Sequence, residues 1–151
     1  MKIVEARAEN SVTGNRVRRI SIVDDDASIR DALKSLMRSA GYNAEAFASA
    51  EEFLASEHLN DTACLILDVH LPGMSGFELQ NHLNIERPTI VERPSLVQRP
   101  RIPIVFITAH ADETLRQRAL KGGAIEFLAK PVRREPLFRA IRAAIEQHRE
   151  A

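Results

Sequence analysis

The chain lacks the features that mark secreted, membrane-spanning or strongly charged proteins. It contains one cysteine, and no apolar stretch is long enough to cross a bilayer. A single cysteine excludes a disulfide framework within the chain and is typical of a reducing compartment. Residues 1–14 alternate charged and apolar side chains and lack the apolar core of a signal peptide. We therefore expect a cytoplasmic protein that has no membrane partner.

An excess of one charge is also absent, because the 151 residues include 21 basic and 21 acidic side chains. A net charge of zero provides no global field to attract nucleic acid, so we expect no direct contact with nucleic acid. The hydrophobic fraction of 44% and the charged fraction of 28% are those of an ordinary globular protein. The length suits one domain with a full hydrophobic core.

The apolar pattern predicts five strands that alternate with five helices. The expected strands are residues 19–23, 43–47, 61–68, 104–108 and 124–128, and the expected helices are residues 27–40, 49–56, 75–83, 112–121 and 134–148. Continuous apolar runs in the third and fourth strands are typical of strands covered on both faces. Strand–helix alternation with right-handed crossovers predicts an α/β fold with a doubly wound, five-stranded parallel sheet. Cys64 lies inside the third strand, so we expect its thiol to serve packing.

Polar residues stand at the ends of these strands. Asp24 and Asp25 follow the first strand, Asp68 closes the third, Thr108 closes the fourth and Lys130 follows the fifth. Because parallel strands end at the same edge of a sheet, these side chains should converge there. Three neighbouring carboxylates repel one another unless a cation neutralises them. Oxygen ligands from two loops suit a hard ion, and a small open site suits Mg²⁺ better than Ca²⁺.

Such a site could carry phosphoryl chemistry. An aspartate can attack phosphorus and become an aspartyl phosphate. The metal, Lys130 and the Thr108 hydroxyl would share the negative charge on the phosphoryl oxygens. Each residue alone also has a structural interpretation, with Thr108 as a strand-end cap and Lys130 as a surface cation. Their coincidence at matching strand ends favours the phosphoryl site.

Four stretches of the chain resemble the receiver domain of two-component response regulators. They are Ile22–Asp26, Leu67–Gly76, Phe106–Ala109 and Phe127–Pro131, in the family's order. In their detail they are most similar to receivers of the LuxR/FixJ-type transcriptional regulators. The resemblance implies the flavodoxin-like (βα)5 receiver fold over residues 19–150, preceded by an amino-terminal arm at residues 1–18.

The resemblance also implies roles for the residues at the strand ends. Asp68 would be the phosphoacceptor, taking a phosphoryl group from the phosphohistidine of a sensor histidine kinase. Mg²⁺ would be bound directly by Asp25, Asp68 and the backbone carbonyl of His70. Asp24 would contact the ion through a water molecule, and Lys130 would pair with the phosphoryl group.

A conformational switch is part of the same implication. Thr108 would swing toward the phosphoryl oxygens, and Phe127 would move inward behind it. The Lys130–Pro131 peptide bond is expected to be cis. The movement would remodel the face formed by the fourth helix, the fifth strand and the fifth helix, which such regulators use to form homodimers or to meet partners.

Two histidines depart from the usual pattern of the family. His70 and His110 lie two residues past Asp68 and Thr108, at positions whose side chains influence how fast the phosphoryl group is lost in this family. Histidines there would either position or obstruct the attacking water. The sequence leaves both options open.

A six-residue motif repeats before the fourth strand. Arg-Pro occurs at the same phase in residues 86–91, 92–97 and 98–103. Proline at every sixth position excludes a helix interior and a central strand, so we expect an extended loop inserted into the receiver at residues 86–103. Both a tolerated insertion and a partner-binding arm fit, because long surface loops cost little free energy.

Three functional hypotheses follow. The first is a stand-alone receiver that acts in a phosphorelay or competes for a kinase's phosphoryl groups, with a downstream phosphotransfer or output protein as partner. The second is the receiver half of a DNA-binding transcriptional regulator, since the closest type carries a helix-turn-helix domain and this chain ends at Ala151. The third is a haloacid-dehalogenase-like phosphatase with an Asp nucleophile, but that family has a second Asp where this chain has His70. We expect a switch rather than an enzyme, with self-phosphotransfer and autodephosphorylation only.

Overall fold

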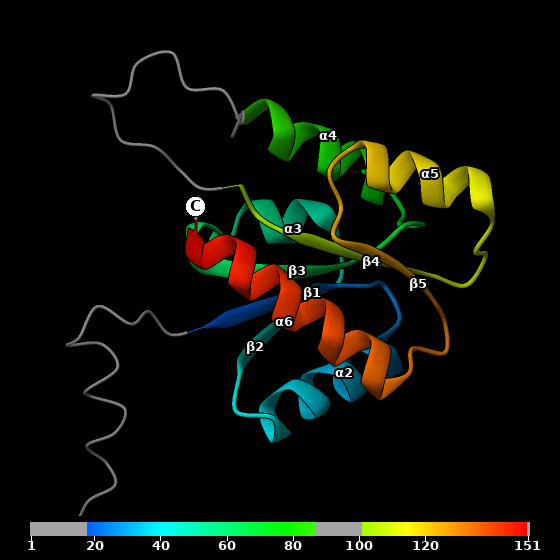
Figure 1. The fold of residues 1–151 in the computed structure, drawn as a ribbon. Coiled ribbons are helices and arrows are strands. Elements are labelled where there is room, and N and C mark those ends of the chain that lie inside the picture. The colour runs from blue at the N-terminus through cyan, green and yellow to red at the C-terminus, as the bar shows by residue number, and fades with distance from the viewer. Residues whose placement is uncertain (1–17, 87–100, 151) are drawn as a thin grey trace, which may run out of the picture.

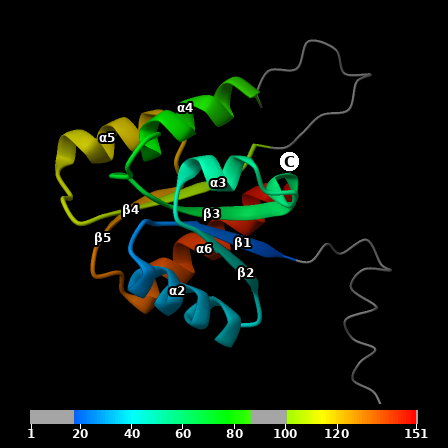
Figure 2. The same ribbon diagram turned by 180° about the vertical axis from the view of Figure 1, so that it is seen from behind.

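The computed structural model describes residues 18–86 and 101–150, and a parallel sheet lies at its centre (Figures 1 and 2). Its strands are β1 (Arg19–Val23), β2 (Asn43–Phe47), β3 (Thr62–Asp68), β4 (Ile104–Thr108) and β5 (Glu126–Ala129). Their order is β2-β1-β3-β4-β5, and every neighbouring pair is parallel. This is the flavodoxin-like strand order, so the expected fold class is confirmed.

Helices cover both faces of the sheet. They are α2 (Ala27–Ser39), α3 (Ala50–Leu54), α4 (Gly76–Glu86), α5 (Glu113–Lys121) and α6 (Arg134–Glu150). In both views α2 and α6 lie on one face, and α3, α4 and α5 lie on the other (Figures 1 and 2). Residues 1–17 and 87–100, which include the expected amino-terminal arm and most of the proline-rich loop, lie outside the described residues.

The core has two halves, one on each face of the sheet, and β3 contributes side chains to both. Cys64 and Ile66 pack toward α2 and α6, whereas Leu65 and Leu67 pack toward α3, α4 and α5. All seven residues of β3 are buried, and each large apolar side chain contributes about 1.5–3 kcal/mol by leaving water. Burial also raises the pKa of the Cys64 thiol to about 12. The thiol therefore stays protonated, as expected for a packing residue.

Local signals explain how most helices begin. Asp26 caps α2, and its carboxylate accepts hydrogen bonds from the backbone N–H groups of Ser28 and Ile29. The third aspartate of the run after β1 is therefore structural. Ser49 caps α3 in the same way, and Asp112 caps α5. These caps satisfy backbone donors that the first turn of a helix leaves unpaired.

Several element boundaries differ from expectation by one to three residues. α3 ends at Leu54 and is followed by an unexpected 3₁₀ turn, Leu59–Asp61. α4 ends at Glu86 rather than at residue 83. Beyond the buried Leu83, the Asn84 side chain donates to the Gly122 carbonyl, with an N–O distance of 3.0 Å. β5 begins at Glu126 rather than residue 124, because the backbone N–H of Ala124 is held by the carbonyl of Ala119.

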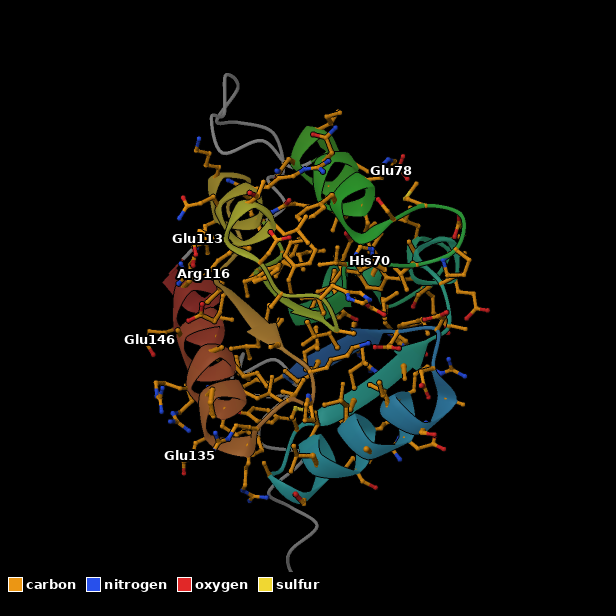
Figure 3. All side chains as sticks on the ribbon, turned by 90° about the vertical axis from the view of Figure 1, so that its right-hand side faces the viewer. His70, Glu78, Glu113, Arg116, Glu135 and Glu146 are labelled. Carbon is orange, nitrogen blue, oxygen red and sulfur yellow. The ribbon has the colours of Figure 1, made fainter. Side chains whose placement is uncertain are left out.

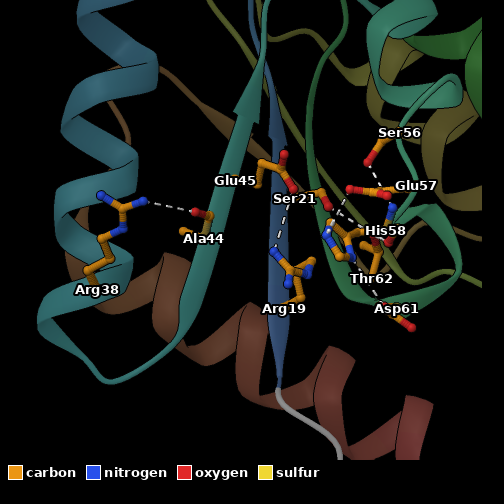
Figure 4. Close-up of polar contacts among 10 residues, drawn as sticks. All are labelled: Arg19, Ser21, Arg38, Ala44, Glu45, Ser56, Glu57, His58, Asp61 and Thr62. Atoms are coloured by element: carbon orange, nitrogen blue, oxygen red, sulfur yellow. Dashed lines mark hydrogen bonds and ion pairs between the residues drawn. The ribbon is translucent and has the colours of Figure 1, made fainter.

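Polar side chains at the amino-terminal ends of the strands have structural partners (Figure 4). The buried hydroxyls of Ser21 and Thr62 lie 2.8 Å apart and bond β1 to β3. The Arg19 guanidinium lies 3.5 Å from the Glu45 carboxylate on the neighbouring strand. The hydroxyl pair satisfies two polar groups that would otherwise be costly to bury, whereas Nε of Arg19 is buried without a hydrogen-bond partner among the described residues.

The turn that follows β3 closes tightly because of Gly76. Its backbone N–H donates to the Val69 carbonyl over 3.0 Å. A β-carbon at this position would lie 2.4 Å from the carbonyl oxygen of Asp68 and 3.0 Å from Cα of Val69. Both are backbone atoms and cannot turn aside. Glycine therefore lets the chain pass directly behind Asp68.

Replacing Gly76 with alanine should destabilise the protein by about 2–3 kcal/mol in urea unfolding, the upper part of the range of about 1–3 kcal/mol that overpacking costs. Gly41→Ala is the matched control. Gly41 has a φ of 92° and no atom within 4 Å of an added β-carbon, so only backbone strain of about 1 kcal/mol is introduced there. Equal losses in the two variants would contradict the close approach at Gly76.

Candidate functional site

The carboxyl-terminal edge of the sheet brings together the polar side chains predicted from the strand ends. Asp24, Asp68 and Thr108 are buried there, with exposed fractions of 0%, 4% and 0%. Lys130 follows β5 and points into the same edge, where its side chain meets the first two carboxylates. Figure 3 looks onto this edge, with His70 near its centre.

Lys130 bridges the carboxylates of two strands. Its Nζ lies 2.8 Å from Oδ2 of Asp24 and 3.2 Å from Oδ2 of Asp68. The other oxygen of each carboxylate accepts a backbone hydrogen bond, from Asp26 at 2.9 Å and from His70 at 3.2 Å. The Lys130–Pro131 peptide bond is cis, as expected. Both carboxylates are thus oriented by contacts from two directions.

A third carboxylate completes an acidic cluster of Asp24, Asp25 and Asp68. Each offers an oxygen, and these oxygens lie within 4.8 Å of one another. Asp25 is exposed and has no hydrogen bond or ion pair with the described residues. Lys130 supplies the ion pairs of the cluster, so negative charge remains in excess. An available oxygen ligand beside uncompensated charge fits a hard divalent cation.

Burial and charge shift the protonation of the two central groups. Burial raises the pKa of Asp68, and repulsion by Asp24 raises it further. The Lys130 charge and the His70 N–H lower this pKa, but the net shift is upward. For Lys130, burial lowers the pKa, yet the hydrogen bond to Asp24 and the charge of Asp68 outweigh it. The pKa of Lys130 is therefore raised, and the ammonium stays charged.

Of the two expected switch residues, Thr108 ends β4 at this edge of the sheet, whereas Phe127 lies within β5 and pairs with Phe106. The Thr108 hydroxyl accepts a hydrogen bond from the backbone N–H of His110 over 3.0 Å. The carbonyl of Thr108 accepts the N–H of Lys130 over 2.8 Å. Phe127, expected to move inward on switching, is already buried with 7% of its surface exposed, in the half of the core under α3, α4 and α5.

Two residues that support the site were not anticipated from the sequence. Arg30 on α2 donates to the backbone carbonyl of Asp24 over 2.9 Å. The carboxylate of Glu51 on α3 accepts the backbone N–H of Met74 over 2.9 Å and so holds the loop that follows Asp68. That hydrogen bond lowers the pKa of Glu51. The partner of Glu51 lies 23 positions away, and Arg30 contacts a backbone carbonyl, so neither contact leaves a local motif.

A buried carboxylate in this environment should cost the protein stability. Because folding raises the pKa of Asp68, stability falls as pH rises from the ordinary carboxyl range through the raised value. Asp68→Asn should therefore be more stable than wild type at neutral pH by about 1 kcal/mol, as measured by urea unfolding without divalent cations. The difference should shrink in acid, where the carboxyl group is protonated.

Asp26→Asn is the control for this substitution. Asparagine caps a helix about as well as aspartate, so the same chemical change next to the cluster should leave stability within about 0.5 kcal/mol. A neutral-pH stability of Asp68→Asn below that of wild type would contradict the proposed electrostatic balance.

Within residues 18–86 and 101–150, none of the helices has the length and apolar composition that crossing a membrane requires.

Comparison with known proteins identifies the family. Residues 20–142 match the family model "Response regulator receiver domain". Nodulation protein W of Bradyrhizobium diazoefficiens is 44% identical over 130 residues, which cover 86% of this chain and 52% of the relative. Transcriptional regulatory protein FixJ of the same organism is 34% identical over 128 residues, covering 85% and 57%. This chain thus spans about half the length of these curated relatives.

A solved structure agrees with the sequence relatives. The response regulator StyR is 41% identical, with a TM-score of 0.73 over 88% of this chain and 61% of its own. The expected resemblance to FixJ-type receivers is therefore confirmed. The chain belongs to the response regulator receiver domain family.

Proposed function

We propose that this chain is a phosphoacceptor receiver of a two-component system, with residues 19–150 as the receiver domain. In this proposal Asp68 takes a phosphoryl group from the phosphohistidine of a sensor histidine kinase, and the modified domain changes its affinity for a partner. One observation supports it above all others. The buried Asp68 carboxylate lies 3.2 Å from the Lys130 ammonium and belongs to a cluster of three carboxylates.

The chemical step is a transfer between two nucleophiles. A carboxylate oxygen of Asp68 attacks phosphorus, and a phosphorus–oxygen bond forms as the phosphorus–nitrogen bond of the phosphohistidine breaks. The histidine of the kinase leaves as a neutral imidazole after protonation. The Lys130 ammonium favours the reactive carboxylate form of Asp68 and can donate to a phosphoryl oxygen.

Mg²⁺ is the cofactor that these ligands fit best. Asp25 and Asp68 would hold it directly together with the carbonyl of His70, and Asp24 would contact it through water. Hard oxygen ligands and an open position toward solvent suit this ion. When bound, Mg²⁺ neutralises part of the negative charge of the phosphoryl group. Asp25 is free to act as a ligand because it has no other partner among the described residues.

Thr108 and Phe127 would carry the signal away from Asp68. Rotation of Thr108 toward a phosphoryl oxygen would exchange its bond with the His110 N–H, which spans 3.0 Å, for one with the phosphoryl group. Rearrangement of Phe127 in the core would then alter the face formed by α5, β5 and α6. That face is the proposed site of homodimer formation or contact with a downstream phosphotransfer or output protein.

This function has two candidate arrangements. A stand-alone receiver would act in a phosphorelay or compete for a kinase's phosphoryl groups. The receiver half of a DNA-binding transcriptional regulator is favoured by FixJ, a transcriptional regulatory protein of which the matched part covers 57%. In both, Asp68 turns over no separate substrate, and His70 stands where an Asp-nucleophile phosphatase would need its second aspartate.

Acetyl phosphate with Mg²⁺ provides a kinase-free test. Wild-type protein should gain one phosphoryl group by intact-mass spectrometry, because Asp68, Lys130 and the proposed metal ligands all belong to this domain. Asp68→Asn should gain none. Asp25→Asn should require a higher Mg²⁺ concentration, since it removes one direct ligand, and a chelator should abolish the reaction.

Asp26→Asn serves as the control, because this neighbour caps α2 and lies outside the acidic cluster. It should be modified at the wild-type rate. Phosphorylation that persists in Asp68→Asn would rule out Asp68 as the acceptor.

A further inference from the structure

Two histidine rings lie close together in an edge arrangement on the exposed side of the site, which we call its mouth. Their side chains have no part in the proposed phosphotransfer. His70 lies in the loop between β3 and α4, and His110 lies in the loop between β4 and α5. Both are exposed. The centroids of their rings lie 5.7 Å apart, and the ring planes are inclined by 74°. Figure 3 shows His70 at this edge.

The backbone holds both histidines next to Asp68 and Thr108. The N–H of His70 donates to Oδ1 of Asp68 over 3.2 Å, and the N–H of His110 donates to the Thr108 hydroxyl over 3.0 Å. The two rings thus belong to neighbouring strand ends whose relative position is set by the β3–β4 pairing. Little backbone ordering is needed to bring the two rings together, which lowers the entropic cost of binding one ligand through both side chains.

The ring spacing suits two nitrogens on one metal ion. With metal–nitrogen distances of about 2.0–2.1 Å, two imidazoles on a tetrahedral ion have centroids roughly 5–6 Å apart. The excess negative charge of the acidic cluster favours a cation at the mouth. Imidazole selects ions such as Zn²⁺, Ni²⁺ and Cu²⁺, whereas Mg²⁺ prefers oxygen. The histidine pair and the acidic cluster should therefore select different metal ions.

We propose that His70 and His110 form a second metal site, which takes a transition-metal ion of the Zn²⁺ type. Water molecules complete its coordination, so the site is open. An ion bound there stands between solvent and Asp68 and slows entry of the phosphodonor. This inhibitory effect rests on the proposed function of Asp68, whereas metal binding by the two histidines does not.

Calorimetric titration of the full chain with Zn²⁺, in excess Mg²⁺ to occupy the acidic cluster, tests the site directly. His70→Asn and His110→Asn should each weaken binding by about tenfold or more, since each removes one of two protein ligands. His58→Asn is the matched control at the opposite end of the strands, where His58 lies near Asp61, and it should leave this binding unchanged. Equal affinity in wild type and either of the first two variants would overturn the proposal.

Phosphorylation by acetyl phosphate separates the inhibitory effect from the proposed function. Zn²⁺ at saturation should slow wild-type modification in excess Mg²⁺ by about tenfold or more, and His110→Asn should be resistant. An equal slowing in His110→Asn would overturn the inhibitory role. Absence of phosphorylation even without Zn²⁺ would instead contradict the function proposed for Asp68, and the calorimetric test of the histidine pair would still decide the metal site.

Discussion

The ammonium of Lys130 lies between two buried carboxylates of neighbouring strands, and the site depends on this contact. Asp24 and Asp68 lie 2.8 and 3.2 Å from it, and without it their negative charges would face each other in a poorly hydrated crevice. One ammonium does not balance the cluster, because Asp25 adds a third carboxylate. Burial and the charge of Asp24 raise the pKa of Asp68, and the remaining negative charge accounts for the proposed need for a divalent cation. The ionised form of Asp68, which phosphotransfer would require, therefore lowers the stability of the fold.

The sheet supplies the precision that this contact requires. Asp68 pairs in register with Ile107, and Thr108 pairs with Ala129, the residue before Lys130. The core is packed on both faces of β3, so the strand end that carries Asp68 has little freedom to move. The loops beyond are fixed by side chains from elsewhere, with Arg30 on the Asp24 carbonyl and Glu51 on the Met74 N–H. A rigid edge of this kind can orient a nucleophile before its phosphodonor arrives.

The strand ends of the site were predictable, whereas its supports were not. Asp68 and Thr108 follow continuous apolar runs, and parallel strands must end at one edge, so their convergence follows from a local pattern. Glu51 acts through the N–H of Met74, 23 positions away, and Arg30 acts through a backbone carbonyl, a group that every residue offers. Such contacts leave no period or motif. His70 and His110 follow two of the same strand ends, but the contact between their rings is visible only in the folded structure.

The most direct test of the central claim is to locate the phosphoryl group itself. After reaction with acetyl phosphate and Mg²⁺, borohydride reduces an aspartyl phosphate to homoserine, which marks the modified position for tandem mass spectrometry of peptides. The structure predicts homoserine at position 68 and aspartate at positions 24 and 25. Homoserine at position 24 or 25, or phosphate recovered on His70 or His110 before reduction, would contradict the account.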